Sequence, residues 1–192
     1  MRTLLITGFD PFGGQRINPS WEAVKLLPEE IGNFRLHKLM IPTVFGEAAE
    51  SVLSVAKELR PDVILSVGQA GGRDAITPER IGINLRSASL PDNAGNQPAQ
   101  EPVIEGGPDG IFSTLPVEEM VKAIRAAGDP ASVSNTAGTF VCNDVLYTLL
   151  HHYAGTSTRV GFVHLPYLPE QGEPNLPLEA MVKALTAAIG VL

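Results

Sequence analysis

The chain has 192 residues, of which 44% are hydrophobic and 18% are charged, and its formal net charge is −7. This length and apolar content exclude a disordered chain and fit one domain with its own core. The acidic balance argues against binding to nucleic acid or to an anionic membrane, because such surfaces require clustered lysine and arginine.

Apolar runs alternate with amphipathic helical patterns along the chain. The periodicity predicts strands at 3–6, 36–41, 62–67, 131–135 and 159–164, and helices at 21–27, 47–59, 117–127, 143–153 and 178–189. This order indicates one α/β domain, residues 1–192, with an open, twisted, mostly parallel sheet and helices on both faces. The ligand site of such a sheet lies beyond the carboxyl ends of its strands.

The segment 85–110 differs from the rest because serine, proline, aspartate, asparagine and glycine dominate it. A loop of this length within a compact domain is usually functional or flexible. We therefore expect this segment near the site. The sequence leaves open whether the segment closes over a ligand.

Two segments that follow predicted strands carry unusual residues. Phe9 and Phe12 lie in the glycine-rich segment 8–14, which lacks the spacing of a phosphate-binding loop. Their rings either pack back onto the core or form the walls of a small apolar pocket. Glu79 follows the glycine-rich turn 68–73 and is either part of an ordinary helix start, with Thr77 as its cap, or a carboxylate of the site.

The chain has a single cysteine, Cys142, at the predicted start of the helix 143–153. Unpaired N–H groups and the positive end of the helix dipole favour a thiolate, so we expect a lowered thiol pKa. His164 ends the strand 159–164. Each residue alone fits a structural role in the core, but a thiol, an imidazole and the carboxylate of Glu79 together can form a nucleophile, a base and its orienting group.

A single cysteine also excludes an internal disulfide and a zinc site built from several cysteines. No stretch reaches the about 20 apolar residues that a membrane-spanning helix needs, and the first residues do not resemble a signal peptide. We therefore expect a cytoplasmic protein.

Several long motifs make the chain resemble the pyroglutamyl peptidase I (pyrrolidone-carboxylate peptidase) family of cysteine peptidases. The motifs are Thr7–Gly14 with Asn18–Trp21, Val67–Gly72 with Thr77–Asn84, Ser134–Asn143, and Phe162–Gln171. The resemblance implies removal of N-terminal pyroglutamyl residues from peptides, with Cys142 as nucleophile, His164 as acid and base, and Glu79 as orienting carboxylate. It also implies that neither a metal nor a cofactor is needed and that the protein is a homo-oligomer, a dimer or a tetramer.

The resemblance also assigns residues to a pyroglutamyl pocket. They are Phe9, Phe12, Thr43, Leu90, Phe140 and Val141. A lactam ring is flat and uncharged, so aromatic walls can bury it while backbone groups, with Gln69 as our candidate, satisfy its polar atoms. An ordinary N-terminal ammonium would lose its water there without gaining a partner, which accounts for rejection of unblocked peptides.

One departure and two alternative functions stay open. Relatives commonly carry arginine where this chain has Ser89. This chain therefore lacks a cation that the relatives have near the expected site. A nucleoside-phosphorylase-like enzyme would need a phosphate-binding cluster, for which Arg73, Arg80 and Arg86 are the nearby candidates. A non-catalytic binder of pyroglutamyl peptides would keep the pocket and lose the three catalytic groups.

Overall fold

The computed structural model describes residues 1–192. The strands are β1 (Arg2–Phe9), β2 (Glu30–Ile31), β3 (Phe34–Ile41), β4 (Val63–Gln69), β5 (Thr77–Pro78), β6 (Ile81–Ile83), β7 (Gly110–Phe112) and β8 (Arg159–Leu165). The helices are α1 (Pro19–Leu26), α2 (Glu47–Leu59), α3 (Val117–Ala126), α4 (Val141–His152) and α5 (Leu178–Ile189). None of the helices is long and apolar enough to cross a bilayer.

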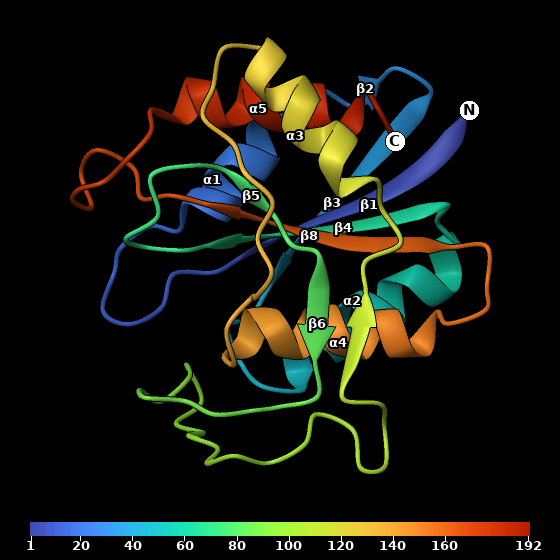
Figure 1. Ribbon diagram of the computed structural model, residues 1–192, viewed down its shortest axis with the longest axis vertical. Coiled ribbons are helices and arrows are strands. Elements are labelled where there is room, and N and C mark those ends of the chain that lie inside the picture. The colour runs from blue at the N-terminus through green and yellow to red at the C-terminus, as the bar shows by residue number, and fades with distance from the viewer.

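A six-stranded sheet forms the centre, in the order β2-β3-β1-β4-β8-β5, and β6 pairs with β7 in a separate ribbon. The four central strands are parallel, whereas β2 and β5 pair antiparallel at the two edges. Helices α1, α3 and α5 lie on one side of the sheet, and α2 and α4 lie on the other (Figure 1). The expected α/β class, with a mostly parallel sheet covered on both faces, is confirmed.

The central strands are buried along most of their length because helices cover both faces. In β8, Val160 and Phe162 join the core beneath α2 and α4, whereas Val163 and Leu165 join the core beneath the other three helices. His164 continues this alternation, so its side chain points to the face covered by α4. The strand register therefore decides which helix the imidazole faces.

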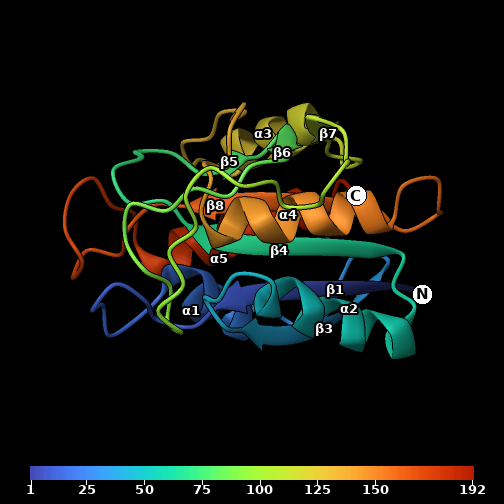
Figure 2. The ribbon, with the colours of Figure 1, turned by 90° about the horizontal axis from the view of Figure 1, so that it is seen from below.

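The carboxyl ends of parallel strands meet at one edge of the sheet. Figure 2 shows the loops that follow β1, β4 and β8 gathered at that edge, on the left of the view, together with part of the segment 85–110. Residues that are far apart in the sequence are therefore brought together there. This edge is where the sequence places the site.

The structure corrects two predicted elements. The segment 131–135 is not a strand, since only isolated bridges join Ala131 to Ile76 and Ser134 to Glu79. The place beside β8 is taken by β5, where Thr77–Pro78 forms an edge strand rather than a helix start. Proline is tolerated at an edge because its missing N–H removes no bond from a central ladder.

The segment 85–110 is held in place on the neighbouring loops. The buried carboxylate of Asp92 accepts hydrogen bonds from the N–H groups of Phe45, Ala94 and Asn96 at 2.8–2.9 Å. Burial acts to raise the pKa of Asp92, but these bonds and one from the Asn96 amide outweigh it, and the pKa is lowered. Asn93 also donates to Asp10 Oδ1 at 3.2 Å. The segment is thus tied to the loops after β1 and β3.

Candidate active site

Glu79 and His164 form a buried acid–base pair at the end of β8. His164 Nδ1 lies 2.7 Å from Glu79 Oε1, and the two residues are 3% and 0% exposed. Antiparallel pairing places Thr77 opposite His164, and the Glu79 N–H donates to the Phe162 carbonyl at 2.9 Å. An ionised carboxylate only accepts, so Nδ1 carries the proton and Nε2 is left as the acceptor.

Cys142 is the second residue of α4, which begins at Val141, two residues earlier than the sequence pattern predicts. Phe140 precedes the helix in an extended conformation and provides no side-chain cap. The N–H groups of the first turn therefore remain available to a ligand, and the dipole favours negative charge beside them. Cys142 as a residue is partly exposed, and its backbone belongs to this first turn.

Gly68 brings the sulfur next to the imidazole. It lies opposite His164 in the β4–β8 ladder, so a side chain at position 68 would project from the same face as His164. A Cβ atom built there would lie 2.9 Å from Cys142 Sγ and 2.7 Å from Phe162 Cζ. The sulfur thus occupies space beside His164 that any larger residue would fill. The His164 side chain is hydrogen-bonded to Glu79 alone, so the thiol is not yet bonded to it.

The expected low thiol pKa is wrong for the resting site. Burial raises the pKa of Cys142 to about 12, and the negative charge of Glu79 acts in the same direction. The charge of Arg73 and a backbone N–H at the helix start lower the pKa, but they offset only part of the rise. The Cys142 thiol therefore rests protonated, and any attack by its sulfur would require a base to take that proton.

The acid–base pair is poised to supply that base. Burial acts to raise the pKa of Glu79, but the hydrogen bond and the charge of His164, together with the hydrogen bond from Arg73, outweigh it and lower the pKa. Burial lowers the pKa of His164, the charge of Arg73 adds to this, and Glu79 opposes it. The pair therefore rests as a carboxylate beside a neutral imidazole.

Asn143 and Asp144, which directly follow the cysteine, anchor the start of α4. The sequence analysis did not identify either residue. Asn143 accepts from the Ile83 N–H at 2.9 Å and donates to the Ile83 carbonyl at 2.8 Å. Asp144 accepts from the Gly46 N–H at 2.8 Å and from Arg86 Nε at 2.5 Å. A sequence signal for such anchors is a polar residue at a helix position that faces the core. The partners of Asn143 and Asp144 come from distant segments, so only the fold shows them.

The predicted phenylalanines lie in two separate sets of aromatic rings, one of which includes His164. The rings of Phe12 and Phe140 are 5.9 Å apart, and Phe45, which the sequence did not single out, meets Phe140 edge-on at 5.3 Å. Phe9 lies 6.2 Å from Phe162, whose ring is 4.7 Å from that of His164. These centroid distances are typical of interacting aromatic pairs.

The other predicted pocket residues have different surroundings. Val141 is fully buried, and Thr43 is buried with its N–H donating to Asp10 Oδ1 at 2.7 Å. Gln69 ends β4, and its side-chain oxygen accepts from Gln171 at 2.9 Å, so the side chain is engaged within the protein. Leu90 is 39% exposed and is the one predicted wall that solvent reaches freely.

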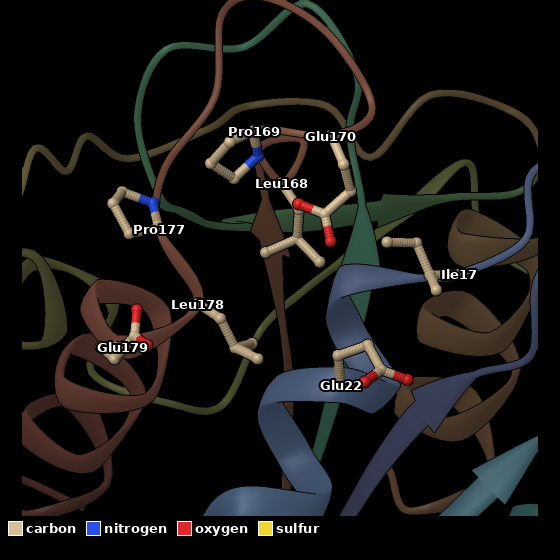
Figure 3. Close-up of a pocket in the computed structure, with 8 residues that line it drawn as sticks. All are labelled: Ile17, Glu22, Leu168, Pro169, Glu170, Pro177, Leu178 and Glu179. Atoms are coloured by element: carbon tan, nitrogen blue, oxygen red, sulfur yellow. The ribbon is translucent and has the colours of Figure 1, made fainter.

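A separate hollow of about 280 Å³ lies near the first turns of α1 and α5 (Figure 3). Its lining is Ile17, Glu22, Leu168, Pro169, Glu170, Pro177, Leu178 and Glu179. None of these is a predicted site residue. No group of three or more histidine, cysteine, aspartate or glutamate residues is arranged to hold a metal ion.

The three arginines weighed for phosphate binding are each engaged by a carboxylate. The pairs are Arg73–Glu79 at 2.7 Å, Arg80–Glu118 at 2.7 Å and Arg86–Asp144 at 2.5 Å. Because these cations are already paired, they do not form an open cluster for a phosphate group. The geometry favours acyl transfer by a thiol over phosphate chemistry.

Comparison with known proteins agrees with this geometry. The family model described as pyroglutamyl peptidase matches residues 2–192. The pyrrolidone-carboxylate peptidases of Escherichia fergusonii and Levilactobacillus brevis are 52% and 53% identical to this chain, covering 98% and 97% of it and 92% and 95% of their own lengths.

Solved structures give the same answer. Pyroglutamyl peptidase I from Bacillus amyloliquefaciens superposes with a TM-score of 0.95 at 45% identity, covering 100% of this chain and 96% of that one. Pyrrolidone carboxyl peptidase from Thermococcus litoralis superposes with a TM-score of 0.95 at 35% identity, covering 100% and 93%. With the thiol, the imidazole and the carboxylate gathered at one edge of this fold, the chain belongs to the pyroglutamyl peptidase family of cysteine peptidases.

Proposed function

We propose that this protein is a pyroglutamyl peptidase I, an omega-peptidase that removes N-terminal pyroglutamyl residues from peptides. The observation that carries the proposal is the buried Glu79–His164 pair beside a thiol at the start of α4. A non-catalytic binder has no need for a buried carboxylate that orients an imidazole. Neither a binder nor a phosphorylase is supported by the relatives described above.

The acylation step follows from the placement of the three groups. His164 Nε2 takes the proton of Cys142 as Sγ attacks the pyroglutamyl carbonyl carbon, and Glu79 stabilises the resulting imidazolium. The negative charge passes to the carbonyl oxygen, where N–H groups of the first turn of α4 can hold it. The carbon–nitrogen bond then breaks, the departing amine takes the proton from His164, and a thioester remains.

Water completes the cycle. His164 removes a proton from the water molecule as its oxygen attacks the thioester carbon. The carbon–sulfur bond breaks, pyroglutamate leaves, and the proton returns to Cys142. Each half-reaction uses the same imidazole, first as base and then as acid.

Specificity is assigned to the phenylalanine rings and to the turn after β4. Phe9, Phe12 and Phe140 supply apolar surface for the lactam, and the backbone at Gln69 is the proposed partner of its polar atoms. Thr43, Leu90 and Val141 complete the proposed lining.

The proposed partners are peptides with an N-terminal pyroglutamate. We further propose that the protein is cytoplasmic and forms a homo-oligomer, whose subunits would contact one another through exposed apolar side chains such as Leu26 and Phe112.

Hydrolysis of a pyroglutamyl aminomethylcoumarin amide beside its prolyl counterpart tests reaction and specificity together. We expect the pyroglutamyl compound to be preferred at least about 100-fold, because the prolyl ammonium would lose its hydration in an apolar pocket. Release of coumarin from neither compound would contradict the activity. Equal rates for the two would contradict the proposed pocket.

The pH dependence of kcat/KM gives a second prediction. The base must be neutral to accept the thiol proton, and burial lowers the pKa of His164 from its ordinary value of 6.5. Activity should therefore persist as the pH falls through 6.5 and be lost only at a more acidic midpoint. Initial rates at substrate concentrations well below KM measure this midpoint, and a midpoint above 6.5 would contradict the assignment.

A further inference from the structure

Arg73 lies in the glycine-rich turn after β4 and binds the catalytic carboxylate. Its Nη1 is 2.7 Å from Glu79 Oε1 and 2.5 Å from Thr77 Oγ1, and its Nη2 donates to the Thr136 carbonyl at 3.0 Å. The side chain is 28% exposed, whereas Glu79 is fully buried. The guanidinium therefore reaches from the protein surface into the buried part of the site.

Arg73 and His164 share a single oxygen of Glu79. Both His164 Nδ1 and Arg73 Nη1 lie 2.7 Å from Oε1, while Oε2 is buried without a hydrogen-bond partner. A carboxylate held by the imidazole alone could turn about its Cγ–Cδ bond. A second donor on the same oxygen position restricts that turn, because a change in the plane of the carboxylate would lengthen one of the two bonds.

The same guanidinium joins the two halves of the active site. Thr136 belongs to the segment that leads into α4 and Cys142, and its carbonyl also accepts from Ser134 Oγ at 2.9 Å. Arg73 thus connects the loop before the nucleophile to the carboxylate that orients the base. A planar, forked donor set suits this task, whereas a lysine ammonium provides one point of charge.

We propose that Arg73 is a positioning residue of this peptidase, which fixes the Glu79 carboxylate for His164 and couples that pair to the loop before Cys142. The inference rests on the proposed function and adds a residue that acts through others rather than on the substrate. It extends the site from three groups to four.

The charge of Arg73 acts on every titratable group of the site. The charged and titratable groups that face His164 are Glu79, Arg73 and the neighbouring Cys142. The cation lowers the pKa of Glu79 through its hydrogen bond, and it lowers the pKa of His164 and of Cys142 through its charge. All three effects favour a charged carboxylate, a neutral base and easier loss of the thiol proton.

The primary test is Arg73→Gln, with the pH profile of kcat/KM as the readout. We expect a loss of about 10-fold at neutral pH, a part of what a well-oriented general base contributes. The acidic midpoint should move to higher pH, because removal of the cation raises the proton affinity of His164. A residue with a merely structural role would lower the rate and leave the midpoint where it is.

Arg80→Gln is the matched control. Arg80 lies beside Glu79 in the sequence and also contacts the segment before α4, through Asn135 at 3.0 Å, but its ion pair is with exposed Glu118. We expect this variant to keep the wild-type rate and midpoint. Arg73→Lys, which keeps the charge and loses the fork, should restore the midpoint but only part of the rate.

A titration of the His164 imidazole by NMR separates this inference from the proposed function. Its ring signals are assigned by their loss in His164→Asn, and the titration midpoint should be higher in Arg73→Gln than in the wild-type protein. If the wild-type protein fails to cleave a pyroglutamyl amide, the proposed function fails, yet this titration still decides what Arg73 does. An unchanged midpoint in Arg73→Gln would overturn the inference.

A double variant covers the case in which Arg73→Gln does not fold because Glu79 is left buried without its cation. Arg73→Gln with Glu79→Gln removes both charges. If Arg73 acts through Glu79, the double variant and Glu79→Gln alone should agree within about twofold at a pH above the acidic midpoint. A further loss of more than about 10-fold in the double variant would overturn the coupling.

Discussion

Cys142→Ser should lose at least about 10,000-fold in kcat/KM on a pyroglutamyl amide, because removal of the attacking atom leaves only binding and oxyanion contacts. The hydroxyl is a far weaker acid than the thiol, and its site already disfavours an anion: burial raises the thiol pKa to about 12. Initial rates with the coumarin substrate measure the loss. Since serine differs from cysteine by one atom, the packing at the start of α4 should be kept.

Two controls make the result of Cys142→Ser specific to chemistry. The urea midpoint of the variant should match that of the wild-type protein, and free pyroglutamate should raise the melting temperature of both. Retention of more than about one hundredth of the wild-type rate would rule out Cys142 as the nucleophile. Loss of the pyroglutamate effect would show that the substitution disturbed the pocket.

Gly68→Ala should lower kcat/KM by about 100-fold, because a displacement of about 1 Å at a reacting group is enough for such a loss. The new methyl group would lie 2.9 Å from Cys142 Sγ and 2.7 Å from Phe162 Cζ, so the sulfur, the ring or the strand must move. Overpacking of this kind also costs about 1–3 kcal/mol of stability. Urea unfolding and turnover should therefore both report the change.

Ser66→Ala is the matched control for Gly68→Ala. Ser66 lies two residues earlier in β4, is fully buried, and its hydroxyl has no hydrogen-bond partner. Its replacement adds no bulk and removes an unsatisfied polar group, so activity should stay within about twofold and stability should not fall. If Gly68→Ala behaves like Ser66→Ala, the sulfur does not occupy the position beside His164 that we describe.

Strong periodic patterns made most of the fold predictable. Helix α2 was expected at Glu47–Leu59 and α5 at Leu178–Ile189, and both match, because buried positions recur with a clear helical period. Elements with two or three residues, such as β5 and β6, have no period to detect. They exist because the edges of the sheet and the ribbon offer partners, which is a tertiary effect.

The site residues were predictable as types but not as an arrangement. Cys142 precedes a predicted helix, His164 ends a predicted strand, and Glu79 lies beyond the turn after another strand. The rule for parallel sheets places His164 and that turn at one edge. The sequence did not indicate that Phe45, Asn143 and Asp144 contribute to the site, because their partners come from distant loops. Their roles depend on contacts that no local pattern encodes.

The thiol pKa shows where a local rule fails. A helix start favours a thiolate, and that effect is present at Cys142, but the surrounding protein removes the hydration that a thiolate needs. Burial outweighs the dipole because a desolvated charge is more costly than a helix end is favourable. The extent of burial could not be seen in the sequence.

The pairing of Gly68 with His164 joins an early strand to a late one. Strands so far apart in the chain pair slowly, since a long loop must close first, and a chain under synthesis cannot form this ladder until β8 has left the ribosome. Peptidase activity would therefore appear only after nearly the whole chain has been made. A chain that ends before β8 would carry Cys142 without His164, and therefore without the base that its thiol needs.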